Sequence, residues 1–225
     1  MINVEICAAS LQSAEAAKLG GAHRIELCRD LSCGGLTPSM DNVACCVGRL
    51  GLRTHVLVRP RAGNFYYNAD EVAEIISTIE ACRRLGAAAV VVGFLTYEGL
   101  IDTRLTRLAV EAANGMEVTF HRAFDEAHQP PLDALHAIAD CGCTRLLTSG
   151  QKPTALEGAE VIAGLVGATH VEVMAGGGVT PANVRQLMQL TGVREVHGSC
   201  KTTMPDGTVQ TDPATVNELI KLTQQ

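Results

Sequence analysis

The chain has 225 residues, a formal net charge of −6 and no tryptophan, and 47% of its residues are hydrophobic. This length suits one domain with a sizeable core, and the mixed charges without a basic block argue against nucleic acid as a partner. No apolar run approaches the roughly 20 residues that cross a bilayer, and the first residues lack the regions of a secretion signal, so we expect no membrane partner and a soluble, cytoplasmic protein.

Eight short apolar runs are typical of β-strands. They are Asn3–Cys7, Arg24–Cys28, Thr54–Arg59, Ala89–Gly93, Glu117–His121, Arg145–Ser149, His170–Met174 and Arg194–Gly198. Segments rich in Ala, Leu and Glu predict helices at Leu11–Leu19, Ser39–Leu50, Ala69–Leu85, Thr103–Ala113, Pro131–Asp140, Thr154–Val166, Pro181–Leu190 and Pro213–Leu222. Regular alternation predicts parallel strands with right-handed crossovers. We therefore expect residues 1–225 to form one α/β domain, a (βα)8 TIM barrel; the alternative is an open, doubly wound sheet.

The parity of residues along the strands predicts a charged barrel interior. Positions such as Val4 and Ile6 suit packing under helices, and the opposite parity faces inward. The inward set is Glu5, Cys7, Glu26, Cys28, His55, Arg59, Thr119, His121, Glu172, Met174, Glu195 and His197. Buried charges are costly unless paired, so we expect an ion-paired network near the barrel mouth. The alternative is that these residues only fill the barrel.

Cys7 and Cys28 end the first two predicted strands in matching Glu-x-Cys triplets. Adjacent strands lie about 4.8 Å apart, so two thiols at equal height would share one ion, and soft thiolates favour Cu(I). In a closed barrel the eighth strand neighbours the first, which places His197 beside Cys7 as a third donor, with Met174 as another. The alternatives are two small packed thiols, and a core imidazole satisfied by a carboxylate.

Several loops that follow strands carry groups that bind anions. The arginines of Arg59-Pro-Arg61 can grip a carboxylate or phosphate, or they lie in a solvated loop. Three glycines precede Thr180, a candidate N-cap, and Pro181, a candidate first helical residue. Barrels often bind phosphate after strands seven and eight, at such a helix start. The expected anion site comprises Arg59, Arg61, Arg122, Ser149, Gly176, Gly177 and Gly178.

The segment Val118–Asp125 is a strand that ends in a base, a cation and an acid, His121, Arg122 and Asp125. This ending is typical of the way an α/β barrel presents catalytic groups. Because the fifth strand lies across the mouth from the first, His121 is poorly placed to share a metal ion with Cys7. Together with Glu26 and Glu172, it is a candidate for proton transfer to a substrate in the mouth.

In combination, these motifs resemble the CutC family of copper homeostasis proteins. The resemblance covers nearly the whole chain and rests on Val4–Cys7, Gly21–Cys28, Gly34–Ser39, Arg59–Arg61, Val118–Asp125, Arg145–Gln151 and Met174–Val179. It implies a cytoplasmic (βα)8 barrel, often oligomeric, associated with copper tolerance and holding Cu(I) on the two cysteines. We therefore expect a homo-oligomeric copper-binding protein with Cys7, Cys28 and His197 as ligands. The alternative is a barrel enzyme that acts on a small anionic or phosphorylated metabolite.

Overall fold

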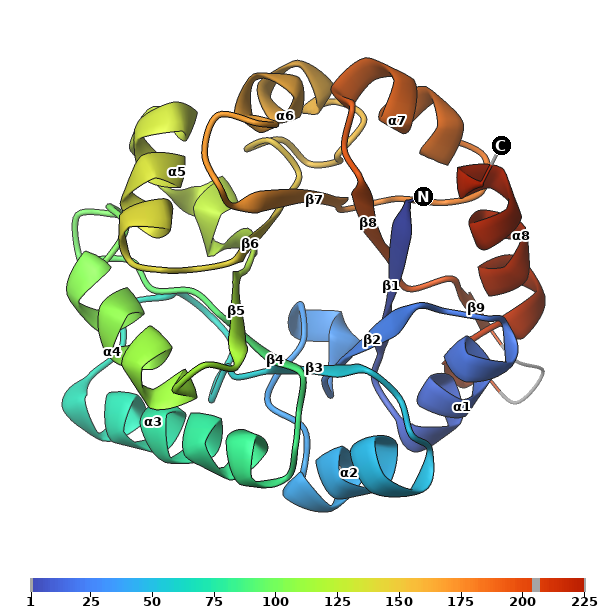
Figure 1. Ribbon diagram of the computed structural model, residues 1–225, viewed down its shortest axis with the longest axis horizontal. Helices are drawn as coiled ribbons and strands as arrows, with labels where there is room; N and C mark the ends of the chain where they lie inside the picture. Colours follow the sequence, from blue (N-terminus) through green and yellow to red (C-terminus); the bar gives the residue numbers. More distant parts are fainter. Residues whose placement is uncertain (1, 204–206, 225) are drawn as a thin grey trace.

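A computed structural model describes residues 2–203 and 207–224 and contains a closed barrel of eight parallel strands (Figure 1). The strands are β1 (Asn3–Ala8), β2 (Arg24–Leu27), β3 (Thr54–Leu57), β4 (Ala89–Val92), β5 (Glu117–Phe120), β6 (Arg145–Thr148), β7 (Glu172–Gly176) and β8 (Glu195–Gly198). Each strand pairs with the next in the chain, and β1 closes the barrel against β8. The predicted barrel is confirmed, and the open sheet is wrong.

A ring of helices surrounds the barrel. They are α1 (Leu11–Leu19), α2 (Met40–Ala44), α3 (Ala69–Arg84), α4 (Thr103–Ala113), α5 (Pro131–Asp140), α6 (Ala159–Leu165), α7 (Val184–Thr191) and α8 (Pro213–Thr223). Side-chain caps fix several of the starts: Asn68 and Glu71 form a reciprocal capping box that begins α3.

Helix α7 begins later than the sequence suggests. The Thr180 N–H donates to Asn183 Oδ1 at 2.9 Å, and the Asn183 amide donates to Gly178 O at 2.8 Å. These bonds hold residues 181–183 as a turn before the helix, so Pro181 is not its first residue. The segment predicted as one helix over Ser39–Leu50 is likewise a short α2 followed by a π-helical turn, Cys45–Arg49.

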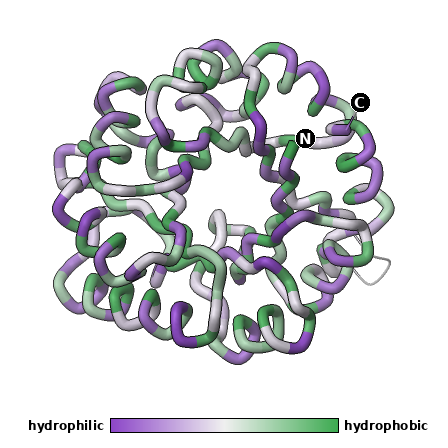
Figure 2. Tube along the Cα trace, in the orientation of Figure 1, coloured by the Kyte–Doolittle hydropathy of each residue, from purple (hydrophilic) through white to green (hydrophobic). Residues whose placement is uncertain are grey.

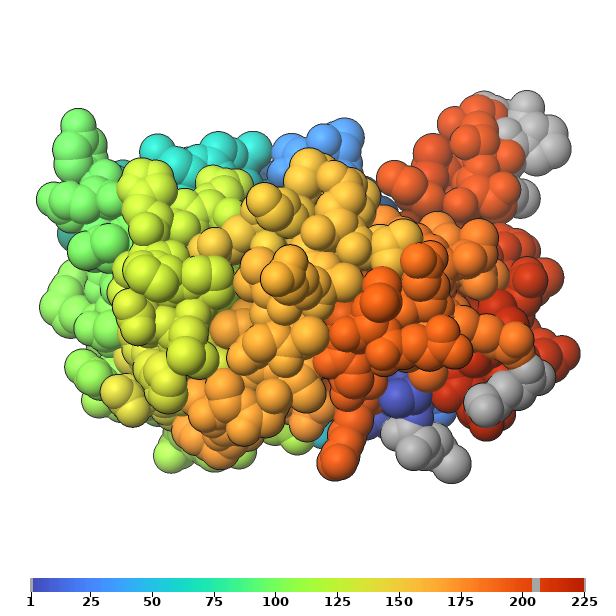
Figure 3. Space-filling model, turned by 90° about the horizontal axis from the view of Figure 1, so that it is seen from above, coloured from blue at the N-terminus to red at the C-terminus, as the bar shows by residue number. Residues whose placement is uncertain are grey.

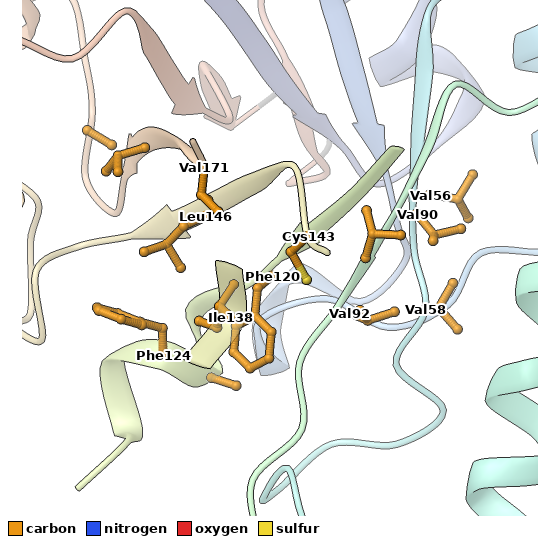
Figure 4. Packing of buried hydrophobic residues seen from close by; sticks show 14 of the residues in the cluster. Val56, Val58, Val90, Val92, Phe120, Phe124, Ile138, Cys143, Leu146 and Val171 are labelled. Carbon is orange, nitrogen blue, oxygen red and sulfur yellow. The ribbon is translucent and has the colours of Figure 1, made fainter. Parts of the chain in front are cut away.

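The hydrophobic core lies between the strands and the helices. Val4 and Ile6 of β1 are completely buried there, as are Phe120 of β5 and Ile138 of α5. Figure 4 shows Phe120 and Ile138 next to each other, with valines of neighbouring strands beyond them. The predicted outward parity is therefore confirmed. Hydrophilic positions occur on the inner ring of strands as well as on the outer helices (Figure 2).

The barrel interior holds a network of ion pairs, most of them buried. Arg24 binds the carboxylates of Glu5 and Glu195, and Arg145 binds Glu195 and Glu117. All of these residues except Glu5 are the first in their strands. The network therefore fills the amino-terminal half of the barrel, which corrects the expectation that it surrounds the mouth. It leaves the carboxyl ends of the strands free to form a site.

Beyond β8, the chain forms an antiparallel hairpin of β9 (Lys201–Thr203) and β10 (Val209–Thr211). This segment lies in the loop Ser199–Asp212, in which residues 204–206 lie outside the described ones. Figure 3 shows the hairpin standing above the rim of the barrel, on the side opposite the start of β1. In the described part of the chain, no helix is long and apolar enough to cross a membrane.

Candidate functional site

A cavity of about 560 Å³ opens at the carboxyl ends of the strands. Its volume is in the range of small-molecule sites. Polar and charged residues line it, together with the apolar side chains of Leu31, Leu57, Phe65 and Leu147. Eight of the site residues expected from the sequence reach this cavity: Cys7, Glu26, Arg59, His121, Arg122, Gly177, Gly178 and His197.

The two strand-end thiols lie together beside the floor of the cavity. Cys7 Sγ is 3.6 Å from Cys28 Sγ and also 3.6 Å from Glu26 Oε1. The sequence suggested equal heights for the thiols, but Cys7 is in register with Glu26, so Cys28 lies two residues further along, just past the end of β2. This offset follows from the stagger of strands in a barrel. Both thiols are nonetheless buried and in contact.

His197 lies beside Cys7, as closure of the barrel predicts. Its Nδ1 is 2.8 Å from Glu5 Oε1, and Arg24 and His55 contact the other oxygen of that carboxylate, at 2.6 Å and 2.9 Å. The imidazole is therefore satisfied by a carboxylate, while the trio of Cys7, Glu26 and His197 still brings three potential ligand atoms within 4.8 Å of one another.

Burial and close contacts shift the protonation of these groups. Burial raises the pKa of Glu26, and the nearby Glu5 charge raises it further. Burial alone would lower the pKa of His197, but the carboxylates of Glu26 and Glu5 outweigh it and raise that pKa above its usual value. The adjacent Cys28 thiol, burial and Glu26 raise the pKa of Cys7. Protons are therefore held tightly on this side of the cavity.

His121 occupies the opposite wall and is uncharged. Burial, together with the nearby Arg59 charge, lowers its pKa to about 3. The Ala123 N–H donates to His121 Nδ1 at 3.1 Å, so the proton of the neutral ring is on Nε2. That Nε2 has no hydrogen-bond partner within residues 2–203 and 207–224. His121 is thus an uncharged donor, and binding a metal through Nε2 would break its bond to Ala123.

Arg122, Ser149 and Gly177 meet where β5, β6 and β7 end. The Arg122 guanidinium donates to Ser149 Oγ and to Asp125, both at 2.8 Å. A Cβ on Gly177 would stand 3.1 Å from Ser149 Cβ and 3.4 Å from Arg122 Cζ, so the glycine loop passes directly beside the guanidinium. Asp125 organises the group, because it also accepts from the Ser149 N–H and from the Gln151 N–H.

Arg59 and Arg61 differ in role. Arg59 is buried and donates to the carbonyls of Cys33, Gly35 and Gly63, so it ties two long loops together at the edge of the cavity. Arg61 binds Glu71 at 2.5 Å and packs over the Tyr67 ring. Arg61 does not line the cavity, and the structure gives it a part in anchoring its loop on α3.

Three other expected residues are placed away from the cavity. Glu172 is the first residue of β7, at the amino-terminal end of the barrel, so the structure does not bring it to Glu26 or His121. Met174 lies in the layer of the ion network, where its sulfur contacts Arg24 at 3.1 Å. Gly176 is buried, and a Cβ there would come within 2.4 Å of Leu147.

Some cavity residues were not among the expected site residues. Phe65 lies beside both Arg59 and His121, with 4.9 Å from its ring centroid to the guanidinium carbon and to the imidazole centroid. Lys201, at the start of β9, also lines the cavity. A basic residue just after the eighth strand is the sequence signal that would have identified it.

The chain is similar to known proteins over most of its length. A sequence profile described as the CutC family matches residues 2–202. A family protein CutC from Photobacterium profundum is 40% identical over 211 residues, 93% of this chain and 86% of that protein. One from Xanthomonas campestris pv. campestris is 45% identical over 202 residues, 89% of this chain and 84% of that protein.

Solved structures with a similar fold are also known. A putative copper homeostasis protein CutC from Streptococcus agalactiae superposes with a TM-score of 0.83 at 33% identity, covering 88% of this chain and 99% of that one. A phosphoribosylanthranilate isomerase from Thermotoga maritima has a TM-score of 0.63 at 14% identity, covering 100% and 99%, which shows a shared fold alone. With its strand-end motifs, its barrel and these relatives in agreement, the chain belongs to the CutC family of copper homeostasis proteins.

Proposed function

We propose that this protein binds one Cu(I) ion through Cys7 and Cys28. The observation that carries the proposal is the 3.6 Å contact between the two thiol sulfurs. Soft thiolates are the ligands that select Cu(I), and two of them fit its low coordination number. All nine cysteines of the chain are free thiols, which suits the reducing cytoplasm where Cu(I) would be handled.

The residues around the thiols suit a buried ion. Cys7, Cys28, Leu57 and Val91 form a small apolar cluster at the edge of the barrel interior, separate from the main core. Such surroundings exclude water, and Cys7, which lines the cavity, gives an ion a path to the pair. Because the pKa of Cys7 is raised, Cu(I) must displace its proton, and binding should release protons and weaken as the pH falls.

A competition titration tests this proposal. Reduced protein is titrated anaerobically with Cu(I) in the presence of a chromogenic Cu(I) chelator, for the wild type and the Cys7→Ser/Cys28→Ser double variant. A Cys33→Ser/Cys45→Ser variant is the control, because both of its thiols lie outside the cavity. Loss of one tight equivalent in the first variant alone supports the proposal. Equal affinity in all three proteins contradicts it.

A second function is favoured by the part of the cavity at the ends of β7 and β8. Gly177 and Gly178 both have positive φ, and their N–H groups donate to no described residue. Arg122 lies beside Gly177, and Lys201 lines the same cavity. Successive free N–H groups with nearby cations bind anions. We propose on this basis that the cavity also accepts a small anionic or phosphorylated molecule.

If that molecule is a substrate, two residues are placed for proton transfer. Glu26, whose pKa is raised, would exchange a proton with it, and His121 would donate a hydrogen bond from Nε2 without carrying charge. Both residues line the cavity. A copper site of two thiols requires neither of them, which is why we retain an enzymatic role beside the first proposal.

Thermal-shift measurements with inorganic phosphate and with simple phosphate monoesters test the anion proposal. The ligands should stabilise the wild type and an Arg194→Gln control, whose arginine does not line the cavity, but not Arg122→Gln. Stabilisation that is equal in Arg122→Gln, or absent from the wild type, would count against an anion site at the glycines.

A further inference from the structure

Three side chains with different donor atoms meet at the floor of the cavity. They come from neighbouring strands: Cys7 from β1, Glu26 from the end of β2 and His197 from β8. One sulfur, one carboxylate oxygen and one ring nitrogen lie within 4.8 Å of one another. Cys7 and Glu26 are almost fully buried, and all three residues line the cavity. The group is therefore preformed on rigid strands rather than on loops.

This donor set differs from the thiol pair in its metal preference. Zn²⁺ is bound in proteins by thiolate, imidazole and carboxylate together, at about 2.3, 2.0–2.1 and 2.0–2.2 Å, and a tetrahedral ion with such bonds holds its ligand atoms roughly 3–4 Å apart. The distance of 3.6 Å from Cys7 Sγ to Glu26 Oε1 already fits. The other two distances are at most 4.8 Å, so small rotations of the His197 and Glu26 side chains would complete the set.

The surroundings of His197 match those of a metal ligand. Its Nδ1 contacts Glu5 at 2.8 Å, which leaves Nε2 as the ring nitrogen available for a metal. Histidines that bind metals commonly donate their other N–H to a carboxylate, which fixes the tautomer and orients the ring. Glu5 is in turn held by Arg24 at 2.6 Å, so its charge is matched without the metal.

We propose that Cys7, Glu26 and His197 form a site for Zn²⁺ or a similar borderline divalent cation, with a fourth position open to the cavity. This inference goes beyond the copper proposal, since it shares Cys7 with that site but does not use Cys28. Three protein ligands and one open position are the arrangement of catalytic rather than structural zinc. The fourth ligand would be water or an oxygen of whatever occupies the cavity.

Zinc affinity in single variants separates the two sites. Metal-free wild type, Cys28→Ser, Glu26→Gln and His197→Gln are titrated with Zn²⁺ against a competing indicator, with Glu111→Gln and His136→Gln as exposed controls. Loss of an outer partner alone typically weakens a metal site by about 10–100-fold, so Glu26→Gln and His197→Gln should weaken binding by more than ~100-fold. Cys28→Ser and the controls should bind Zn²⁺ as the wild type does.

Cobalt substitution supplies a second readout. Co²⁺ bound to the wild type should give the visible absorption of a tetrahedral site and one thiolate-to-cobalt band, lost in Cys7→Ser and retained in Cys28→Ser. X-ray absorption of the zinc form should give one sulfur neighbour and two or three nitrogen or oxygen neighbours. A site with two sulfurs that requires Cys28, or no stoichiometric binding by folded wild type, overturns the inference. Loss of Cu(I) binding in Cys28→Ser bears only on the copper proposal.

Discussion

Asp125 should be the residue whose charge holds the β5 and β6 ends of the cavity together. Its carboxylate accepts from the Ser149 and Gln151 N–H groups, from the Ser149 and Thr148 hydroxyls and from Arg122 Nε. Its side chain is only 8% exposed, against 44% for that of Arg122. Asp125→Asn keeps the shape and one acceptor oxygen, and it places an NH2 group against donors.

The expected loss of stability in Asp125→Asn follows from the hydrogen bonds that this substitution weakens or removes. A hydrogen bond to a charged group contributes about 1.5–3 kcal/mol, and Asp125→Asn removes the charge that Arg122 pairs with and one acceptor oxygen, so we expect the free energy of unfolding to fall by about that amount. For a domain of this size each kcal/mol lowers the melting temperature by about 2–4 °C, which gives a decrease of roughly 3–12 °C. Thermal and urea unfolding followed by circular dichroism measure it.

Glu126→Gln is the matched control, because Glu126 is the next residue in the chain and is exposed. It should melt as the wild type does. If Asp125→Asn melts no lower than this control, the carboxylate is not the organiser of the two strand ends. The same variant should also weaken any phosphate-induced stabilisation, since Arg122 then loses the partner that holds it beside Gly177.

Three further predictions concern the barrel interior. Because His121 is neutral in the folded protein, with a pKa of about 3, while the unfolded chain takes up the proton near pH 6.5, wild-type stability should fall on acidification below that pH by up to about 1.4 kcal/mol per unit. Urea unfolding at several pH values should give a shallower decline for His121→Asn. Glu195→Gln should cost about 3–5 kcal/mol in chemical denaturation, because it leaves Arg24 and Arg145 buried without their shared carboxylate. Gly93→Ala should cost about 1–3 kcal/mol by the same assay, since its Cβ would come within 2.3 Å of the His121 ring.

The barrel was predictable because the periodicities of its strands and of its helices are each visible within a short stretch of sequence. Val4 and Ile6 alternate with Glu5 and Cys7 in β1, and this parity alone places the first pair under helices and the second inside. Barrel closure then places His197 beside Glu5, a contact between residues 192 positions apart. The placement of Val4 and Ile6 and the contact of His197 with Glu5 follow from the strand order and the parity alone, and both can be read from a single sequence.

Which charges pair with each other depends on the stagger between neighbouring strands, and the sequence alone does not predict that stagger. Arg24 and Arg145 begin their strands, where a charged residue before an apolar run is commonly a solvated end. Only the stagger of the closed barrel brings Glu195 between them. For the same reason Glu172 has the inward parity of a catalytic residue but stands at the wrong end of β7. The parity of a residue predicts whether its side chain points into the barrel or toward the helices. Its height along the barrel axis depends on the register between neighbouring strands.

The same register explains how one cysteine enters two donor sets. Equal heights would have placed Cys28 directly opposite Cys7 and Glu26 below both, leaving a site of thiols alone. Instead Glu26 is in register with Cys7. Cys28 is the next residue of the same chain segment that points inward, and its sulfur contacts the Cys7 sulfur from there. Cys7 therefore lies between a soft ligand on one side and a carboxylate and an imidazole on the other. Both sites would use the same thiolate, and two cations held so close together repel each other, so we expect Cu(I) and Zn²⁺ to compete for Cys7. Adding Cu(I) to the zinc form should release Zn²⁺ one for one, whereas simultaneous stoichiometric binding of both ions would contradict this competition.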